Sequence, residues 1–114
     1  MWSQLENVFN ETGLEYFRQG SISEGKKWEK SFFTFWNMDT PESGFYDNEA
    51  HKVIWYWTVY HYTSDPALLY SGLEDFISKA KEAGFIVNGR GVDVPSGRPD
   101  YVGRMVTVVW VENL

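Results

Sequence analysis

One uninterrupted run of strand-forming residues constrains the fold more than any other part of this sequence. Residues 52–63, KVIWYWTVYHYT, contain no glycine or proline and are mostly aromatic or β-branched, the side chains that favour extended backbone. The run is twelve residues long, whereas a typical strand has about five or six. We therefore expect one strand that crosses a sheet with length to spare.

The two faces of this strand differ in character, because successive side chains of a strand point to opposite faces. One set is the more apolar and suits a face covered by helices; it comprises Val53, Trp55, Trp57, Val59 and His61. The other set is rich in tyrosine and comprises Ile54, Tyr56, Thr58, Tyr60 and Tyr62. We expect the second face to be partly exposed to solvent or covered by a partner.

Two amphipathic segments predict helices. Residues 3–11 form the first, with an apolar stripe at spacings of three and four that comprises Trp2, Leu5, Val8 and Phe9. The second begins at Ser64-Asp65-Pro66, where a capping side chain precedes a proline at the first helical position, and it ends at Gly84. Its stripe comprises Leu69, Leu73, Phe76, Ile77 and Ala80.

Four further segments complete the expected order. Residues 31–37 are aromatic and β-branched and predict a strand, and residues 14–19 predict either a brief strand or a continuation of the first helix. Residues 85–94 and 101–112 predict two strands that form an antiparallel hairpin. The connections are a polar loop over residues 20–30 and a long acidic loop over residues 38–50.

These elements predict one domain over all 114 residues. The fold class is α+β: a two-layer sandwich with a mostly antiparallel sheet of about four to five strands and two helices packed on one face.

The composition excludes several classes of function. Sixteen acidic against ten basic side chains give a net charge of −6, which is the wrong sign for gripping a nucleic-acid backbone. The chain has no cysteine, so it has neither disulfides nor thiolate metal ligands. No stretch has the roughly 20 apolar residues of a membrane span, and the start, MWSQLENVFN, lacks the pattern of a secretory signal. We expect no membrane association and no secretion.

Motifs that carry chemistry are also missing from the sequence. The two histidines, His51 and His61, lie about 33 Å apart on an extended strand and cannot share a metal or a substrate. There is no G-x-S-x-G elbow, the acidic loop does not match a calcium-binding loop, and Asn88-Gly89-Arg90-Gly91 matches no phosphate-binding motif. We therefore predict no catalytic, metal-binding or cofactor-binding residues, and an enzyme is the minority interpretation.

Aromatic residues are unusually abundant. Six Trp, seven Tyr and eight Phe make up 18% of the chain, and each such ring buries about 150–250 Å² in a core or an interface. A protein of this size has a small core relative to its surface. We therefore expect part of the aromatic surface to be buried against other chains.

Residues 32–112 resemble the tail terminator and tail completion proteins of long-tailed bacteriophages. The resemblance lies in the strand FFTFWN followed by TPESGFYDNEA, in KVIWYWTVYHYTSDP, in the helix end KEAGF and in the terminal GVDVPSGRPDYVGRMVTVVWVE. These are patterns of strand, turn and helix residues, not catalytic signatures. The first 30 residues share only the general residue character of the family.

The resemblance implies a structural protein of the virion, made in the host cytoplasm and placed at the head-proximal end of the tail. It implies a homo-oligomeric ring, a hexamer, that contacts the tail tube protein on one side and the head-tail connector or stopper protein on the other. DNA only passes through the channel, and the acidic charge of the chain suits a channel that repels phosphate.

The resemblance also suggests where the contacts lie. The acidic loop over residues 39–49 corresponds to a loop that projects toward a neighbouring ring, and the loop over residues 90–101 connects the last two strands. Together with the tyrosine-rich face, these loops give a candidate interface: Asp39, Glu42, Phe45, Tyr46, Asp47, Glu49, Tyr56, Tyr60, Tyr62, Arg90, Arg98, Asp100 and Arg104. Arg98 and Asp100 are candidates for an ion pair between protomers.

Two alternatives remain open on sequence grounds. The chain can be a monomeric binding module that presents exposed Trp and Tyr rings as a platform for a sugar or a peptide. Both candidate loops can equally be ordinary surface loops, since exposed charges contribute little to binding. A hydrolase would require an acid-base pair clustered in a cleft.

Overall fold

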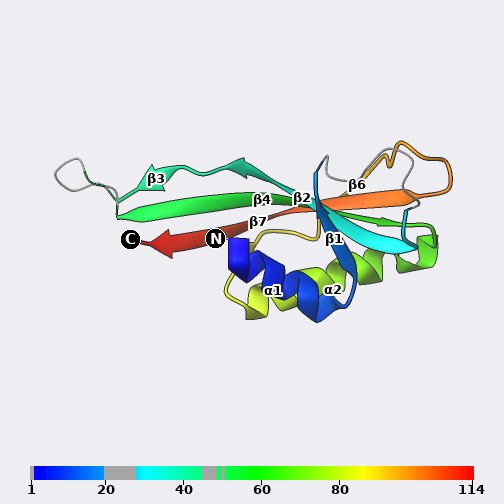
Figure 1. The fold of residues 1–114 in the computed structure, drawn as a ribbon, viewed down its shortest axis with the longest axis horizontal. Helices are drawn as coiled ribbons and strands as arrows, with labels where there is room; N and C mark the ends of the chain where they lie inside the picture. The colour runs from blue at the N-terminus through cyan, green and yellow to red at the C-terminus, as the bar shows by residue number, and fades with distance from the viewer. Residues whose placement is uncertain (1, 20–27, 45–48, 50) are drawn as a thin grey trace.

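Residues 52–63 form the long central strand of the molecule (Figure 1). The structure is a computed structural model and describes residues 2–19, 28–44, 49 and 51–114. In chain order the elements are α1 (Trp2–Thr12), β1 (Glu15–Arg18), β2 (Ser31–Asp39), β3 (Glu42–Ser43), β4 (Lys52–Thr63), the 3-10 helix η1 (Pro66–Leu68), α2 (Leu69–Glu82), β5 (Ile86–Val87), β6 (Val92–Val94) and β7 (Val102–Asn113). The predicted α+β class is confirmed.

The strands form one mixed, mostly antiparallel sheet in the order β1-β2-β4-β7-β5. β3 pairs with β4, β6 pairs with β7, and only the β1–β2 pair is parallel. β4 pairs with β7 along its whole length, from Lys52 opposite Asn113 to Thr63 opposite Val102. The twelve-residue strand therefore forms the middle of the sheet, with a neighbour on each side.

Both helices pack on the same face of the sheet (Figure 1). The core between the two layers comprises Leu5, Val8 and Phe9 of α1, Leu73, Phe76, Ile77 and Ala80 of α2, Phe33 and Phe35 of β2, Trp57 and Val59 of β4, Phe85, and Val106 and Val108 of β7. The predicted division of the long strand is confirmed, because Trp57, Val59 and His61 lie buried on the helix-covered face.

The expectation of one continuous strand over residues 85–94 is wrong. The segment forms two short strands, β5 and β6, which both pair antiparallel with β7 across a turn over residues 88–91. Gly89 and Gly91 have φ of 88° and 87°, in the left-handed region that interrupts a strand and that glycine adopts most easily. The predicted antiparallel pairing with the last strand is confirmed.

Two of the expected connections contain additional regular structure. Residues 14–19 form a brief strand, β1, because Gly13 at φ 75° ends α1. The strand predicted over residues 31–37 continues to Asp39 through a bulge, and β3 then pairs with the start of β4. The acidic connection is thus partly strand, and its residues 45–48 and 50 lie outside the described part of the chain.

The molecule is elongated. Its Cα radius of gyration is 15.3 Å, compared with about 13 Å for a compact domain of this length. Figure 1 shows the reason: β3 and the adjoining ends of β4 and β7 extend beyond the two helices. We call this extension, residues 42–43, 52–54 and 111–113, the arm.

Candidate protein interface

The sheet face opposite the helices has no second layer of helices or strands within the described residues. Residues that are paired side by side on adjacent strands share a face, so the register assigns this surface directly. We call its uncharged part the open face; it comprises mainly Phe17, Phe32, Thr34, Trp36, Met38, Ile54, Tyr56, Thr58, Tyr60, Tyr62, Ile86, Val92, Val94, Gly103, Met105, Thr107, Val109 and Val111.

The most exposed apolar side chains of the open face lie mainly along its two flanks. Trp36 and Met38 lie on β2, Ile86 and Val92 lie on β5 and β6, and Val111 lies toward the arm, with exposed fractions between 36% and 59%. Within the described residues, three other large apolar side chains are as exposed, and they lie elsewhere: Leu68, Tyr70 and Leu114. Large apolar patches on one face mark interaction surfaces.

None of the residues that form the open face is charged. The register places three charged residues on the same side of the sheet at the border of the open face: Glu15 beside Phe32, Asp39 beside Tyr56, and Lys52 at the start of β4. The centre of the face is therefore neutral in a chain whose net charge is −6. Interface centres are typically depleted in charged residues in this way.

The three predicted tyrosines lie on the open face and are half-buried. Tyr60 and Tyr62 stack with ring centroids 6.0 Å apart. Burial raises the pKa of Tyr62, and the neighbouring Tyr60 raises it further. The raised pKa keeps the Tyr62 hydroxyl neutral at physiological pH.

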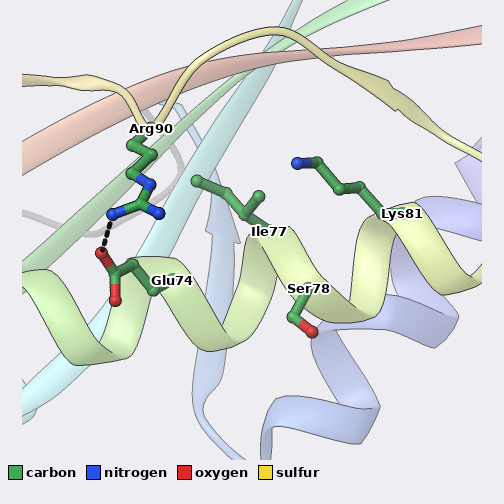
Figure 2. Close-up of a pocket in the computed structure, with 5 residues that line it drawn as sticks. All are labelled: Glu74, Ile77, Ser78, Lys81 and Arg90. Atoms are coloured by element: carbon green, nitrogen blue, oxygen red, sulfur yellow. Dashed lines mark ion pairs between the residues drawn. The ribbon is translucent and has the colours of Figure 1, made fainter.

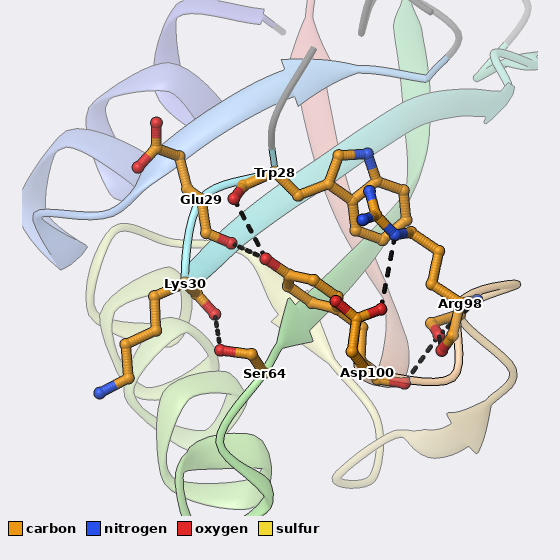
Figure 3. A network of polar contacts seen from close by, with 8 residues as sticks. Trp28, Glu29, Lys30, Ser64, Arg98 and Asp100 are labelled. Atoms are coloured by element: carbon orange, nitrogen blue, oxygen red, sulfur yellow. Dashed lines mark hydrogen bonds and ion pairs between the residues drawn. The ribbon is translucent and has the colours of Figure 1, made fainter. Parts of the chain in front are cut away.

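One end of the open face is covered by Trp28. Its ring packs 5.2 Å from Phe32, 5.9 Å from Tyr62 and 5.0 Å from Tyr101, measured between ring centroids. The Tyr101 hydroxyl donates to the backbone carbonyls of Trp28 and Glu29, 3.1 and 2.8 Å away (Figure 3). We call Trp28, Arg98 and Tyr101 the clamp, because they connect β2 and β7 across this end.

Arg98 and Asp100 interact within the chain. The Arg98 guanidinium lies 4.5 Å from the Trp28 ring centroid, and its Nε lies 3.6 Å from a carboxylate oxygen of Asp100 (Figure 3). Beside the clamp is an open pocket of about 400 Å³ lined by Trp28, Glu29, Lys30, Ser64 and Tyr101. The partners that we expected from a second protomer are thus available within one chain.

Arg104 also makes its contacts within one protomer. Its guanidinium donates to Asp93 at 2.6 Å and to the Gly91 carbonyl at 3.0 Å, and it covers the Tyr70 ring at 4.7 Å. It lies opposite His61 in the register, on the helix-covered face. Arg104 therefore fastens the turn between β5 and β6 to β7 and α2.

Arg90 lies in the same turn but is exposed. It pairs with Glu74 of α2 at 3.7 Å, at the rim of a shallow pocket of about 250 Å³ that Ile77, Ser78 and Lys81 also line (Figure 2). The two cations and one carboxylate surround an open surface rather than a cleft that excludes water.

The acidic candidates Asp39, Glu42 and Glu49 are all exposed. Asp39 ends β2 and Glu42 lies in β3, so both belong to strands at or next to the arm. Phe45, Tyr46 and Asp47 lie outside the described residues. The open face extends onto the arm through Ile54 and Val111, and the exposed carboxylates lie beside it.

The two histidines lie apart, as expected. His51 is exposed at the arm end of β4, whereas His61 is 1% exposed under α2, with Nδ1 3.2 Å from the Leu69 carbonyl oxygen. Burial lowers the pKa of His61, and the hydrogen bond to Leu69 raises it by a smaller amount. His61 is therefore a packed core residue. The described part of the chain brings together no group of three side chains that could hold a metal ion, and it has no helix long and apolar enough to span a bilayer.

Sequence reasoning identified the tyrosines but missed Trp36, Met38, Ile86, Val92 and Val111. The signal was present in part, because alternation along residues 31–37 places Trp36 on one face with Phe32 and Thr34. Assigning that face to solvent requires the pairing register. The sequence matches no known family model and no curated protein significantly.

Proposed function

We propose that this chain is a structural virion protein that caps the tail tube of a long-tailed bacteriophage and joins it to the head connector as a ring. It acts by self-association and docking, without chemistry of its own. Its partners are further copies of itself, the tail tube protein and the connector or stopper protein.

The observation that carries this proposal is the uncovered, apolar open face. Large apolar side chains held in water on one side of a sheet lose the hydrophobic stabilisation of about 25 cal/mol per Å² that burial gives. Contacts within one protomer leave large parts of Trp36, Met38 and Ile86 exposed to water. A protein that is completed by other chains accounts for it.

The elongated shape supports the same proposal. The arm lies beyond the helices (Figure 1) and carries the exposed carboxylate of Glu42 and the exposed amine of Lys52, with the exposed Glu49 in the adjoining connection. A projecting, charged element can reach a neighbouring ring and meet a complementary surface there. The net charge of −6 also suits a channel through which DNA slides without binding.

The test is assembly in vitro. Purified protein is added to tail tubes that lack their terminal ring, and the tube ends are imaged by electron microscopy. We expect rings at one end only, and binding to isolated connectors by cosedimentation. If neither tubes nor connectors bind the protein, the proposal fails.

A charge reversal on the arm sharpens this test. Glu42→Lys is expected to weaken binding to tubes or connectors at least several-fold, because it replaces an exposed carboxylate of the arm with a cation. Glu11→Lys is the control, since Glu11 is exposed on α1, away from the arm. If the two substitutions weaken binding equally, the loss comes from the change in net charge and not from the position of Glu42 on the arm.

A second candidate function is a monomeric platform for a sugar or a peptide. The Trp36 ring favours it, because this ring is 43% exposed on the open face. An exposed indole offers a flat apolar surface on which a sugar ring or a peptide side chain can pack. Titration with oligosaccharides and peptides would then shift the tryptophan fluorescence of a protein that stays monomeric.

A further inference from the structure

We infer that, in the purified protein, two copies of this chain cover each other's open face and form a two-fold symmetric dimer, sheet against sheet. This inference does not depend on the proposed function. It specifies which surface is buried and which occupant buries it.

The exposed area suits a dimer. A fully exposed large apolar or aromatic side chain presents on the order of 150–250 Å². At exposed fractions of 36% to 59%, the five side chains that flank the open face present roughly 400 Å². The half-buried residues of the same face, such as Tyr56, Tyr60 and Met105, extend the surface toward the roughly 800 Å² per partner of a stable interface.

The charge distribution favours a second copy over a charged partner. Two molecules of net charge −6 repel each other overall, so contact requires a surface without charge. The open face is that surface, because none of its residues is an aspartate, glutamate, lysine, arginine or histidine. A strongly basic partner would find its complement on the arm rather than here.

Burial of apolar area determines how the copies meet. If the open face of one copy packed on the solvated helices of another, a pair of copies would leave the second open face in water, and only closure into a ring would cover it. Packing open face on open face buries both in one contact. Two sheets can pack in this way about 10 Å apart, as in β-sandwiches.

The flanking residues locate the two-fold axis. Trp36 and Met38 lie on one flank, and Ile86 and Val92 lie on the other, so the axis falls over β4 and β7 between them. Thr107 of β7 lies in this central part of the face. The clamp bounds the contact at one end, because it already covers Phe32 and Tyr62.

Sedimentation equilibrium tests the dimer. Over about 1–100 μM we expect the mass to rise toward twice the 13.3 kDa of the chain. Ile86→Ser and Trp36→Ser should each weaken dimerisation at least tenfold, since each substitution occurs twice in a two-fold interface. Leu68→Ser is the matched control, because Leu68 is an exposed leucine in η1, off the open face, and it should dimerise as the wild type does.

Cross-linking tests the geometry independently of affinity. The chain has no cysteine, so Thr107→Cys and the exposed helix position Ser71→Cys each introduce a single thiol. A short bis-maleimide should link Thr107→Cys into dimers at high yield and leave Ser71→Cys monomeric. Circular dichroism verifies that each variant folds.

Three results would overturn the inference: a wild type that stays monomeric throughout the range, open-face variants that dimerise normally, or equal cross-linking at both thiols. A protein that dimerises in this way but ignores tail tubes and connectors would overturn the proposed function alone. A monomer that caps tubes would overturn this inference alone.

Discussion

At the scale of single residues, a close approach between Gly72 and His61 joins α2 to the sheet. Gly72 lies so near His61 that a Cβ built at position 72 would come within 2.3 Å of the imidazole Cε1. The ring has little room to move, because it is buried and packs 5.1 Å from the Phe33 ring centroid. Glycine in a helix normally costs about 1 kcal/mol relative to alanine, so here close packing outweighs helix propensity.

Gly72→Ala should therefore destabilise the fold. We expect the free energy of unfolding to fall by about 1–3 kcal/mol, the usual cost of overpacking a core. Ser78→Ala on the exposed side of α2 should change it by less than about 0.5 kcal/mol. Urea denaturation of both variants measures the difference, and a Gly72→Ala variant more stable than the wild type would contradict the packing argument.

The buried His61 should make stability depend on pH. Its pKa is lowered from 6.5 by burial in the folded state, so as pH falls below about 6.5 the unfolded chain binds a proton that the folded chain resists. The free energy of unfolding then falls with decreasing pH, by at most about 1.4 kcal/mol per pH unit. Between pH 7.5 and the folded pKa, His61→Gln should flatten this slope.

His51→Gln is the control for that measurement, because His51 is exposed at the arm end of β4. It should leave the slope unchanged. A slope that survives His61→Gln would assign the effect to other groups.

At the scale of elements, the turn between β5 and β6 depends on two glycines in different ways. Gly89 and Gly91 both have positive φ. A Cβ at Gly89 meets nothing within 4 Å, whereas one at Gly91 would come within 2.3 Å of the Met105 carbonyl oxygen. Gly89 is needed only for its backbone angle, while Gly91 also lets the turn approach β7.

Replacing each glycine by alanine should separate the two effects. Gly89→Ala should cost about 1 kcal/mol of unfolding free energy, the price of a left-handed non-glycine residue. Gly91→Ala should cost clearly more, because the backbone carbonyl cannot rotate away as a side chain would. Similar values for the two variants, measured by thermal denaturation, would show that the approach to β7 is not tight.

The sequence specifies some elements of this fold better than others. α2 and β4 could be predicted, because a helical stripe and the alternation along a strand act locally. The predicted start of α2 is too early, since Asp65 and Pro66 begin the 3-10 helix η1 and α2 itself begins at Leu69 without a side-chain cap. The break between β5 and β6 could not, since the same glycines would fit a bulged continuous strand. Likewise, the partners of Arg98 and Arg104 depend on contacts between segments far apart in the chain, so sequence spacing alone could not place these residues in the protomer.

At the scale of the whole molecule, the apolar surface left in water differs from the one expected. Most rings are buried or half-buried in the described part of the chain, including a core cluster of Phe9, Phe33, Phe35 and Phe76. Only Trp36 and Tyr70 are exposed aromatics there. The uncovered surface is therefore largely aliphatic, and it arises because two short helices cover only one side of a long sheet.

Net charge should oppose association of the protomers. Each copy carries −6, and repulsion between the copies extends over a Debye length of about 10 Å at 0.1 M salt but only about 3 Å at 1 M. The open face itself has no ion pair for salt to weaken. The dissociation constant of the dimer should therefore fall as sodium chloride rises from about 0.02 to 0.5 M. Sedimentation equilibrium across that series measures the dissociation constant at each salt concentration. If the dimer instead weakens as salt rises, ion pairs of peripheral residues such as Asp39 and Lys52 hold the copies together, and the neutral face does not.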